Sequence, residues 1–224
     1  MHIEPGIVDG ARIALGYATG AASLGLSLRV ARRLVACEGV VPFAVRSVIA
    51  TALVFAFFEI LPHHPVGVSE VHLILGSTLF LLFGAGPAAV GLAAGLLIQG
   101  LFFAPFDLPQ YGMNVTTLLV PLAGVAVLAR RIIAPDTAYA DLDYRQVLSL
   151  SAAYQGGIVA WVAFWAFYGQ GLSVENLAAV GTFAAAYTTV LLVEPLVDLA
   201  VLAGAKAMSG RSVFILQRRL FHAA

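Results

Sequence analysis

The first two residues, Met1 and His2, carry three nitrogen atoms that can bind one divalent cation. The terminal amine and the amide nitrogen of His2 close a five-membered chelate ring, and the same amide nitrogen and the imidazole close a six-membered ring. A fourth nitrogen would complete a square-planar site, the geometry typical of Cu(II) and Ni(II). Because ionising a backbone amide requires a strongly bonding metal, this donor set disfavours Mg, Ca and Mn.

We expect the mature protein to keep this N-terminal tip, which we define as residues 1–10. Initiator methionine is usually trimmed before small residues, and His2 is bulky. The apolar run that follows has neither a basic leader before it nor an evident cleavage site after it, so a removable signal peptide is not expected. Pro5 and Gly6 supply a turn that would let the tip bend back between helices.

Three further histidines are candidates for the fourth nitrogen. His63 and His64 stand between two prolines in LPHHP, which predicts a loop. His72, in SEVHLILG, falls at the outer end of the next apolar segment, and an ionisable side chain entering the membrane indicates a functional site. His72 is our first choice because a helix would hold it rigidly. His64 is the second choice, together with its neighbour His63.

Each histidine also has an ordinary interpretation when it is taken alone. His2 could be a chance residue, a histidine pair in a loop is commonly solvated, and His72 could form a hydrogen bond inside a helical bundle. The combination favours a site, because four of the five histidines fall on one side of the predicted bundle. Only His222 falls on the other side.

The composition indicates an integral membrane protein. Hydrophobic residues make up 61% and charged residues 11% of the 224 residues, whereas soluble domains have about 25% charged residues. Mean hydropathy is +0.95. The net charge of zero gives no indication of nucleic-acid binding. The single cysteine, Cys37, excludes an internal disulfide and a cysteine-based metal site.

Seven apolar segments are long enough, or nearly so, to cross a membrane, which takes about 20 residues in a helix. We therefore predict an all-α, polytopic bundle of about seven transmembrane helices that forms one domain over residues 1–224. Residues 134–145 are predicted to be a polar cytoplasmic linker and residues 209–224 an amphipathic cytoplasmic tail. The predicted spans are residues 11–31, 41–61, 69–84, 86–104, 113–133, 146–169 and 177–205.

The basic residues that flank these spans predict the orientation of the bundle. With the N-terminus outside and the C-terminus in the cytoplasm, they fall on the cytoplasmic side, as the positive-inside rule requires, and Arg12 is the exception. The residues on that side are Arg29, Arg32, Arg33, Arg46, Arg130, Arg131, Arg145, Lys206, Arg211, Arg218 and Arg219.

Polar residues inside the predicted spans are weaker indications of function. Gln99, in LLIQGLFF, could orient a ligand, although an interhelical hydrogen bond is the simpler interpretation. Asn114, in YGMNVTTL, is predicted to cap the start of a helix. Glu194 and Asp198 lie one turn apart in the last span. They could mark a proton path, but a position nearer the cytoplasm favours docking to a partner.

Four stretches in this order, MHIEPG, GVSEVHLILG, GLLIQGLFF and YGMNVTTLLVPL, resemble the CbiM/NikM family. Its members are the substrate-binding membrane (S) components of energy-coupling factor transporters for cobalt and nickel. The likeness covers the first two-thirds of the chain well and the last third loosely. It implies that the amine of Met1, the backbone and imidazole nitrogens of His2, and His72 hold the metal. It also implies that Gln99 and Asn114 lie beside the site.

The resemblance implies partners as well. These are a transmembrane coupling protein and two cytosolic ATPase subunits in a bacterial or archaeal cell membrane, with room for a small accessory membrane subunit. Co²⁺ or Ni²⁺ is then the transported substrate, and no organic cofactor is expected. A stripe of small residues, Ala14, Ala18 and Ala22, could pack against the coupling protein or equally within this chain.

The family's His-x-Pro-x-x-x-x-Glu run is only partly present. The corresponding stretch, YTTVLLVE, keeps Glu194 but has Tyr187 and Thr189 where histidine and proline are usual.

Two other functions would need features that differ from these. An intramembrane metalloprotease needs a motif such as His-Glu-x-x-His, which the sequence lacks, so the chain is not expected to be an enzyme. An S component for an organic vitamin would have an aromatic-lined pocket and no use for His2. The aromatic run WVAFWAFYG is equally typical of a lipid-facing belt.

Overall fold

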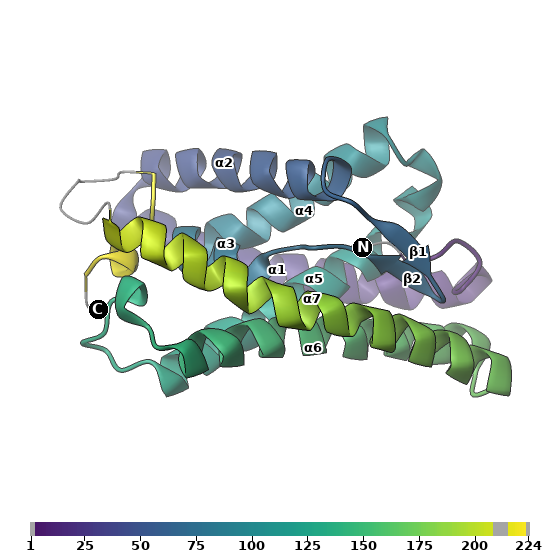
Figure 1. Cartoon of the computed structure of the whole chain (residues 1–224). Helices are drawn as coiled ribbons and strands as arrows, with labels where there is room; N and C mark the ends of the chain where they lie inside the picture. The colour runs from purple at the N-terminus through teal and green to yellow at the C-terminus, as the bar shows by residue number, and fades with distance from the viewer. Residues whose placement is uncertain (1–2, 208–214, 223–224) are drawn as a thin grey trace.

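A computed structural model describes residues 3–207 and 215–222 of the chain (Figure 1). This part contains seven α-helices, and six of them are long and apolar enough to cross a membrane. The predicted all-α bundle of about seven helices is therefore confirmed. The helices are α1 Ile13–Glu38, α2 Val40–Glu59, α3 Gly76–Phe83, α4 Ala85–Phe102, α5 Tyr111–Ile132, α6 Tyr144–Gln170 and α7 Val174–Ala207.

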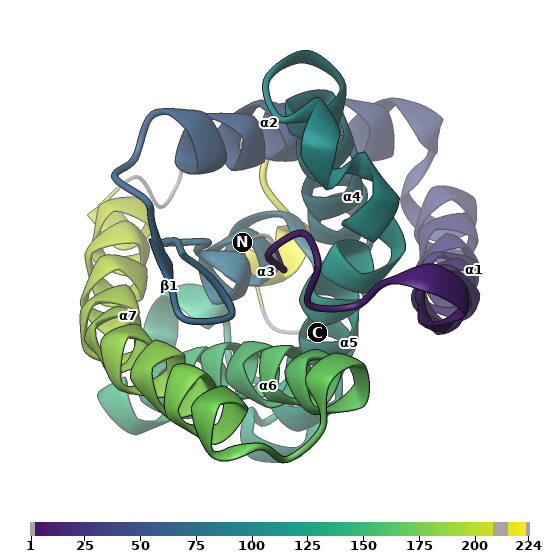
Figure 2. The same ribbon diagram turned by 90° about the vertical axis from the view of Figure 1, so that its right-hand side faces the viewer.

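The long helices enclose the short helix α3 and the start of the chain (Figure 2). Helix α2 packs on α4, α5 on α6, and α6 on α7, while α1 packs on the outer side of α5 and α4. Helix α3 has eight residues, too few to cross the hydrocarbon layer, and all of them except Leu82 are buried. The core of the bundle is therefore built around α3.

The third predicted span, residues 69–84, is wrong as a membrane-spanning helix. Its first residues form strand β2, Ser69–Val71, which pairs antiparallel with β1, His64–Val66. Residues 72–75 belong to neither a helix nor a strand, and the helix begins only at Gly76. Alternating valines around a turn at Gly67 favour a hairpin, and an apolar run alone does not distinguish a buried extended segment from a helix.

Glycines bring α1 and α5 into close contact. A side-chain carbon on Gly20 would lie 3.0 Å from the Cα atom of Gly112, and one on Gly112 would lie 2.6 Å from the carbonyl oxygen of Gly16. Close backbone approach of this kind is how small residues join membrane helices. The stripe of Ala14, Ala18 and Ala22 is exposed on another face of α1. The contact within the chain is therefore made by the glycines.

One end of the bundle, which we call the basic end, is closed by the 134–145 segment and by the described part of the C-terminal tail. Lys206 pairs with Asp141 at 2.7 Å. The backbone N–H of Gln217 donates to the carbonyl of Leu82 at 2.8 Å, and Leu220 is buried. Residues 215–222 thus pack against α3, while residues 209–214 and 223–224 of the predicted amphipathic tail lie outside the described residues.

Candidate metal site

The N-terminal segment enters the bundle at the end that carries the β1–β2 hairpin, which we call the tip end. The side chain of Ile3 is only 1% exposed. Its backbone N–H donates to Oδ1 of Asn114 at 2.9 Å, and Ile3 forms an antiparallel bridge with Ser69. The N–H of Glu4 donates to the carbonyl oxygen of Val68 at 3.3 Å. The start of the described chain is therefore fixed between α5 and the hairpin.

The predicted turn at Pro5 and Gly6 is present and leads the chain out of the bundle. Gly6 has a φ of +89°, which favours glycine, and the N–H of Ile7 donates to the carbonyl oxygen of Glu4 at 3.1 Å. Beyond the turn, the guanidinium of Arg12 donates to the carbonyl oxygen of Gly169 at the end of α6. The described start of the tip is thus held at Ile3 and Glu4, and the chain just beyond the tip is held at Arg12.

Asn114 does not cap its helix as the sequence predicted. Helix α5 begins at Tyr111, and Gln110 is its N-cap residue, so Asn114 lies within the helix and is buried. Its side-chain oxygen does not cap the helix and instead accepts the hydrogen bond from the N–H of Ile3. The two residues are 111 positions apart, and no local sequence pattern reveals such a contact.

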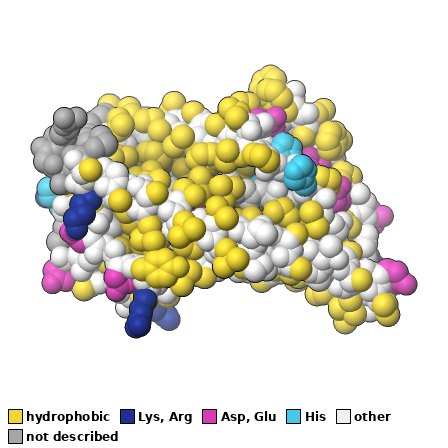
Figure 3. Space-filling model, in the orientation of Figure 1, with side chains coloured by type: hydrophobic (Ala, Val, Ile, Leu, Met, Phe, Trp, Pro, Cys, Tyr) yellow, Lys and Arg dark blue, Asp and Glu magenta, His cyan; other side chains and the backbone are white. Residues whose placement is uncertain are grey.

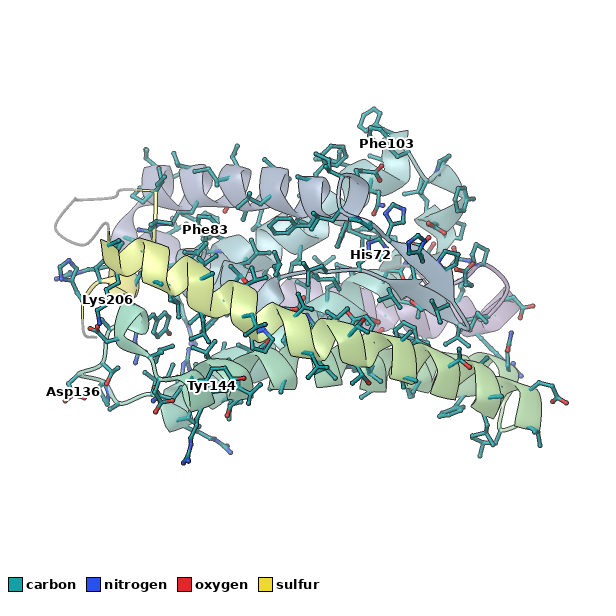
Figure 4. The ribbon with its side chains drawn as sticks, in the orientation of Figure 1. His72, Phe83, Phe103, Asp136, Tyr144 and Lys206 are labelled. Atoms are coloured by element: carbon teal, nitrogen blue, oxygen red, sulfur yellow. The ribbon has the colours of Figure 1, made fainter. Side chains whose placement is uncertain are left out.

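His72 directly follows β2 and is not on a helix as predicted (Figure 4). Its side chain is buried, and Nε2 is 2.8 Å from Oε2 of Glu70. The imidazole ring stacks on His63, with ring centroids 4.8 Å apart and planes inclined by 6°. The edge of the ring also meets Phe58, at 5.5 Å between centroids. The predicted histidine cluster therefore contains His63 and His72 in direct contact.

His64 occupies a different place from the one predicted. It belongs to strand β1 and is exposed, and it lines a groove of about 460 Å³ between the hairpin and α7. The other lining residues of this groove are almost all apolar, although His72 borders it from the inner side.

A small polar cavity of about 170 Å³ lies beside the histidine pair. Three acidic residues contribute to its wall, and so does Gln99 from α4. A concave site with acidic walls attracts cations. The sequence placed Gln99 near the histidines, and the structure brings it to the same cavity as His63 and Glu70. The full lining is Glu59, His63, Glu70, Gln99, Phe103, Ala104, Phe106 and Asp107.

Within residues 3–207 and 215–222, no three His, Cys, Asp or Glu side chains meet in an arrangement that could hold a metal ion. Met1 and His2 lie outside the described residues. His222 is exposed and belongs to the described part of the C-terminal tail at the basic end, where its backbone N–H donates to the carbonyl oxygen of Arg218. The described side chains thus give one buried histidine, its carboxylate partner and a polar wall, and a complete ligand set would need further donors.

Glu194 is not on a surface open to a partner, contrary to the prediction. It has no exposed area, and its carboxylate bonds the hydroxyl of Ser77 at 2.9 Å and the amide of Gln155. The sequence could not reveal this, because α7 is apolar all round and has no distinct inward face. The alanine stripe on α1 is the part of the predicted docking set that is exposed.

Comparisons with known proteins show the same architecture. Two solved structures match, one described as a truncated transition metal transporter and one as a transition metal transporter. The first has a TM-score of 0.71 and 20% identity and covers 93% of this chain and 99% of its own. The second has a TM-score of 0.70 and 20% identity, with 96% of both chains covered. At this identity they show a common fold.

A comparison with curated proteins found no match. The sequence profile of the CbiM family, described as the cobalt uptake substrate-specific transmembrane region, matches residues 2–211. The match spans the tip from His2 onward, the hairpin and His72 after it, and the seven described helices. It makes the chain a multi-pass membrane transport protein and not an enzyme. The chain belongs to the CbiM family.

Proposed function

We propose that this chain is the metal-binding membrane component of an energy-coupling factor transporter that imports Co²⁺ or Ni²⁺. The observation that carries the proposal is the burial of Ile3, which Asn114 and the hairpin hold inside the bundle. Consecutive Cα atoms are about 3.8 Å apart, so His2 is tied to a residue that already lies in the interior. Family membership supports the same role.

The proposed ligands are the amine of Met1, the amide and imidazole nitrogens of His2, and the imidazole of His72. Glu70 lies 2.8 Å from Nε2 of His72 and would accept its N–H. A carboxylate in this position fixes the tautomer of a metal-binding histidine and increases its basicity. In that tautomer Nδ1 of His72 is the metal-binding atom. His63 is the better reserve ligand than His64, because it stacks on His72.

The polar cavity would receive the hydrated ion before it is bound. Glu59, Glu70 and Asp107 contribute negative charge to its wall, and Gln99 offers an amide. Asn114 has a positioning role in this proposal, since it holds the backbone nitrogen of Ile3 and so aims the tip at His72.

We propose that the basic end faces the cytoplasm of a bacterial or archaeal cell and the tip end faces outside. The Lys and Arg side chains of the visible face gather at one end, beside a small histidine patch, and a larger histidine patch lies near the other end (Figure 3). The exposed stripe of Ala14, Ala18 and Ala22 is the surface we assign to the transmembrane coupling protein. Two cytosolic ATPase subunits would supply energy, and a small accessory membrane subunit could complete the complex.

The test is Ni²⁺ and Co²⁺ binding to the full-length protein in detergent, measured by calorimetry. His2→Ala removes the imidazole donor, and one residue added before Met1 moves the terminal amine away from His2. We expect either change to lower the metal affinity by more than about 100-fold. This loss exceeds the cost of removing an outer-shell partner of a ligand. His222→Ala is the matched control, because this histidine is exposed at the basic end. Unchanged affinity in the His2 variant would refute the ligand set, and a vitamin-binding component would show that result.

A further inference from the structure

Two carboxylates lie inside the bundle, on a helix that carries none of the proposed metal ligands. Glu194 and Asp198 are one turn apart on α7 and have no exposed area. The hydroxyl oxygen of Ser77 on α3 lies 2.9 Å from Oε1 of Glu194 and 2.7 Å from Oδ2 of Asp198. The ion pairs among the described residues include neither carboxylate. Acids in such positions are costly, and they commonly mark functional sites in membrane proteins.

The other oxygen atom of each carboxylate also accepts a hydrogen bond. The hydroxyl of Thr78 donates to Oδ1 of Asp198, and the side-chain amide of Gln155 on α6 donates to Oε2 of Glu194. All four carboxyl oxygens therefore have a hydrogen-bond partner from α3 or α6. The cluster joins three elements at the centre of the bundle.

The Ser77 hydroxyl makes two short contacts with the carboxyl groups, and these contacts need one proton more than the hydroxyl supplies. A serine hydroxyl has a single proton to donate. If Ser77 donates to one carboxylate, the contact with the other carboxyl needs a proton on the carboxyl oxygen, which then donates to Ser77. Two ionised carboxylates around one hydroxyl would instead repel each other strongly in a medium that excludes water.

Two buried phenols without a hydrogen-bond partner among the described residues lie near this cluster. The titratable groups that face the pair are Tyr154 from α6 and Tyr187 from α7, while α3 contributes only hydroxyls. Both phenols lie within electrostatic range of Glu194. Their hydroxyls are buried and bond no other group among the described residues. The ring of Tyr154 lies against Gly76, next to Ser77. Each phenol is a donor available to a second negative charge.

We propose that Glu194, Ser77 and Asp198 form a proton-binding site that holds one proton inside the bundle at neutral pH. The proton is bound to a carboxyl oxygen that faces Ser77, and this carboxyl O–H donates a hydrogen bond to the serine hydroxyl oxygen. When the proton leaves to water, the pair carries two negative charges. The phenols of Tyr154 and Tyr187 then donate to them, and α3 loses its shared bond to α7.

This site holds the segment that carries His72. Four residues separate His72 from Ser77, and one of them, Leu75, has a φ of +57° and a ψ of +38°. A leucine in the left-handed region is strained, and such strain persists only where the surroundings hold the chain on both sides. Here the hairpin holds one side and the proton-binding site the other. The short segment between Ser77 and His72 links the proton-binding site to the proposed metal ligand. That this link affects metal release rests on the proposed function.

Infrared spectroscopy of the full-length, metal-free protein in detergent tests the proton directly. We expect the wild type at neutral pH to show the carbonyl band of a protonated carboxylic acid, and this band to disappear in one step as the pH is raised. Glu194→Gln and Asp198→Asn each remove the need for a shared proton, so each should lose the band. Asp141→Asn, in an exposed ion pair, is the matched control and should keep it.

A wild-type protein without this band, or a band that either single variant leaves intact, would overturn the proposal. The amides of the two variants can still donate to Ser77, and circular dichroism establishes that they fold; the pH titration of the wild type needs no variant. The measurement uses no metal, so it is independent of the metal-binding test.

Hydrogen exchange tests the link to α3. In Ser77→Ala we expect the backbone amides of residues 76–79 to exchange at least about tenfold faster, because a lost hydrogen bond to a charged group shifts local opening by that factor or more. Ser149→Ala, on an exposed face of α6, should leave these amides unchanged. Equal exchange rates in the two variants would refute the proposed role of the Ser77 hydroxyl in holding α3 to α7.

Discussion

Asn114 offers the sharpest test of how the tip is positioned, because it acts on the tip without binding the metal. Its Oδ1 atom accepts the N–H of Ile3 at 2.9 Å, and both residues are buried. Asn114→Leu keeps a side chain of similar size but removes the acceptor. A buried N–H without a partner costs about 1–3 kcal/mol. That penalty falls on the docked tip alone, since water satisfies the N–H of a released tip.

The size of the effect on metal binding follows from this penalty. If only the docked tip binds metal, the apparent affinity falls with the fraction of docked tip. Where docking of the tip is itself only marginally stable, a penalty of about 1–3 kcal/mol weakens Ni²⁺ binding by about fivefold to 150-fold. The burial of Ile3 and the bond from Glu4 to Val68 remain and keep the loss within this range.

The assay is calorimetric titration of the full-length protein with Ni²⁺, and Asn114→Asp is the matched control. Aspartate keeps an acceptor oxygen where Ile3 needs it, so we expect this variant to retain binding within a few-fold of the wild type. Wild-type affinity in Asn114→Leu would refute the positioning role. Equal losses in both variants would show that the amide group, and not its acceptor oxygen, matters.

Two further predictions follow from other contacts of the described chain. Glu70→Gln should weaken Ni²⁺ binding by about 10- to 100-fold, because it removes the carboxylate that orients His72 at 2.8 Å; an unchanged affinity would show that Glu70 has no such role. Gly112→Val should lower thermal stability by about 1–3 kcal/mol, since its side chain would overlap the carbonyl of Gly16. Ala22→Val, on the exposed face of α1, should melt like the wild type, and equal melting of the two variants in detergent would refute the close packing of α1 on α5.

The sequence was sufficient to predict those features that depend on the composition of a single segment. Six spans could be recognised because each is a long apolar run, and their bounds agree with α1, α2, α4, α5, α6 and α7 within a few residues at most ends. The largest difference is at α1, which continues from the predicted end at residue 31 to Glu38. Arg29, Arg32 and Arg33 interrupt the apolar pattern there, although arginine is a good helix former.

The roles of Asn114 and Glu194 could not be found in this way, because each depends on a contact between distant segments. Asn114 bonds a backbone group 111 residues away, and Glu194 bonds Ser77 at a separation of 117. A soluble helix reveals its inward face by an apolar stripe, but α7 is apolar on all sides. The sequence therefore located both residues on the correct helices and gave no indication of what they contact.

The error over residues 69–84 has a physical reason that also explains the site. A helix satisfies its own backbone groups, so it has no carbonyl or N–H to offer to a neighbouring chain. The tip needs such partners, because Ile3 and Glu4 lie in extended backbone inside the bundle. Ser69 and Val68 supply them as part of a strand and its turn. Extended backbone is tolerated at membrane depth only where protein buries it, and the ring of long helices around α3 provides that burial. The absence of a helix over residues 69–75 is thus what leaves backbone partners for Ile3 and Glu4 at the start of the described chain.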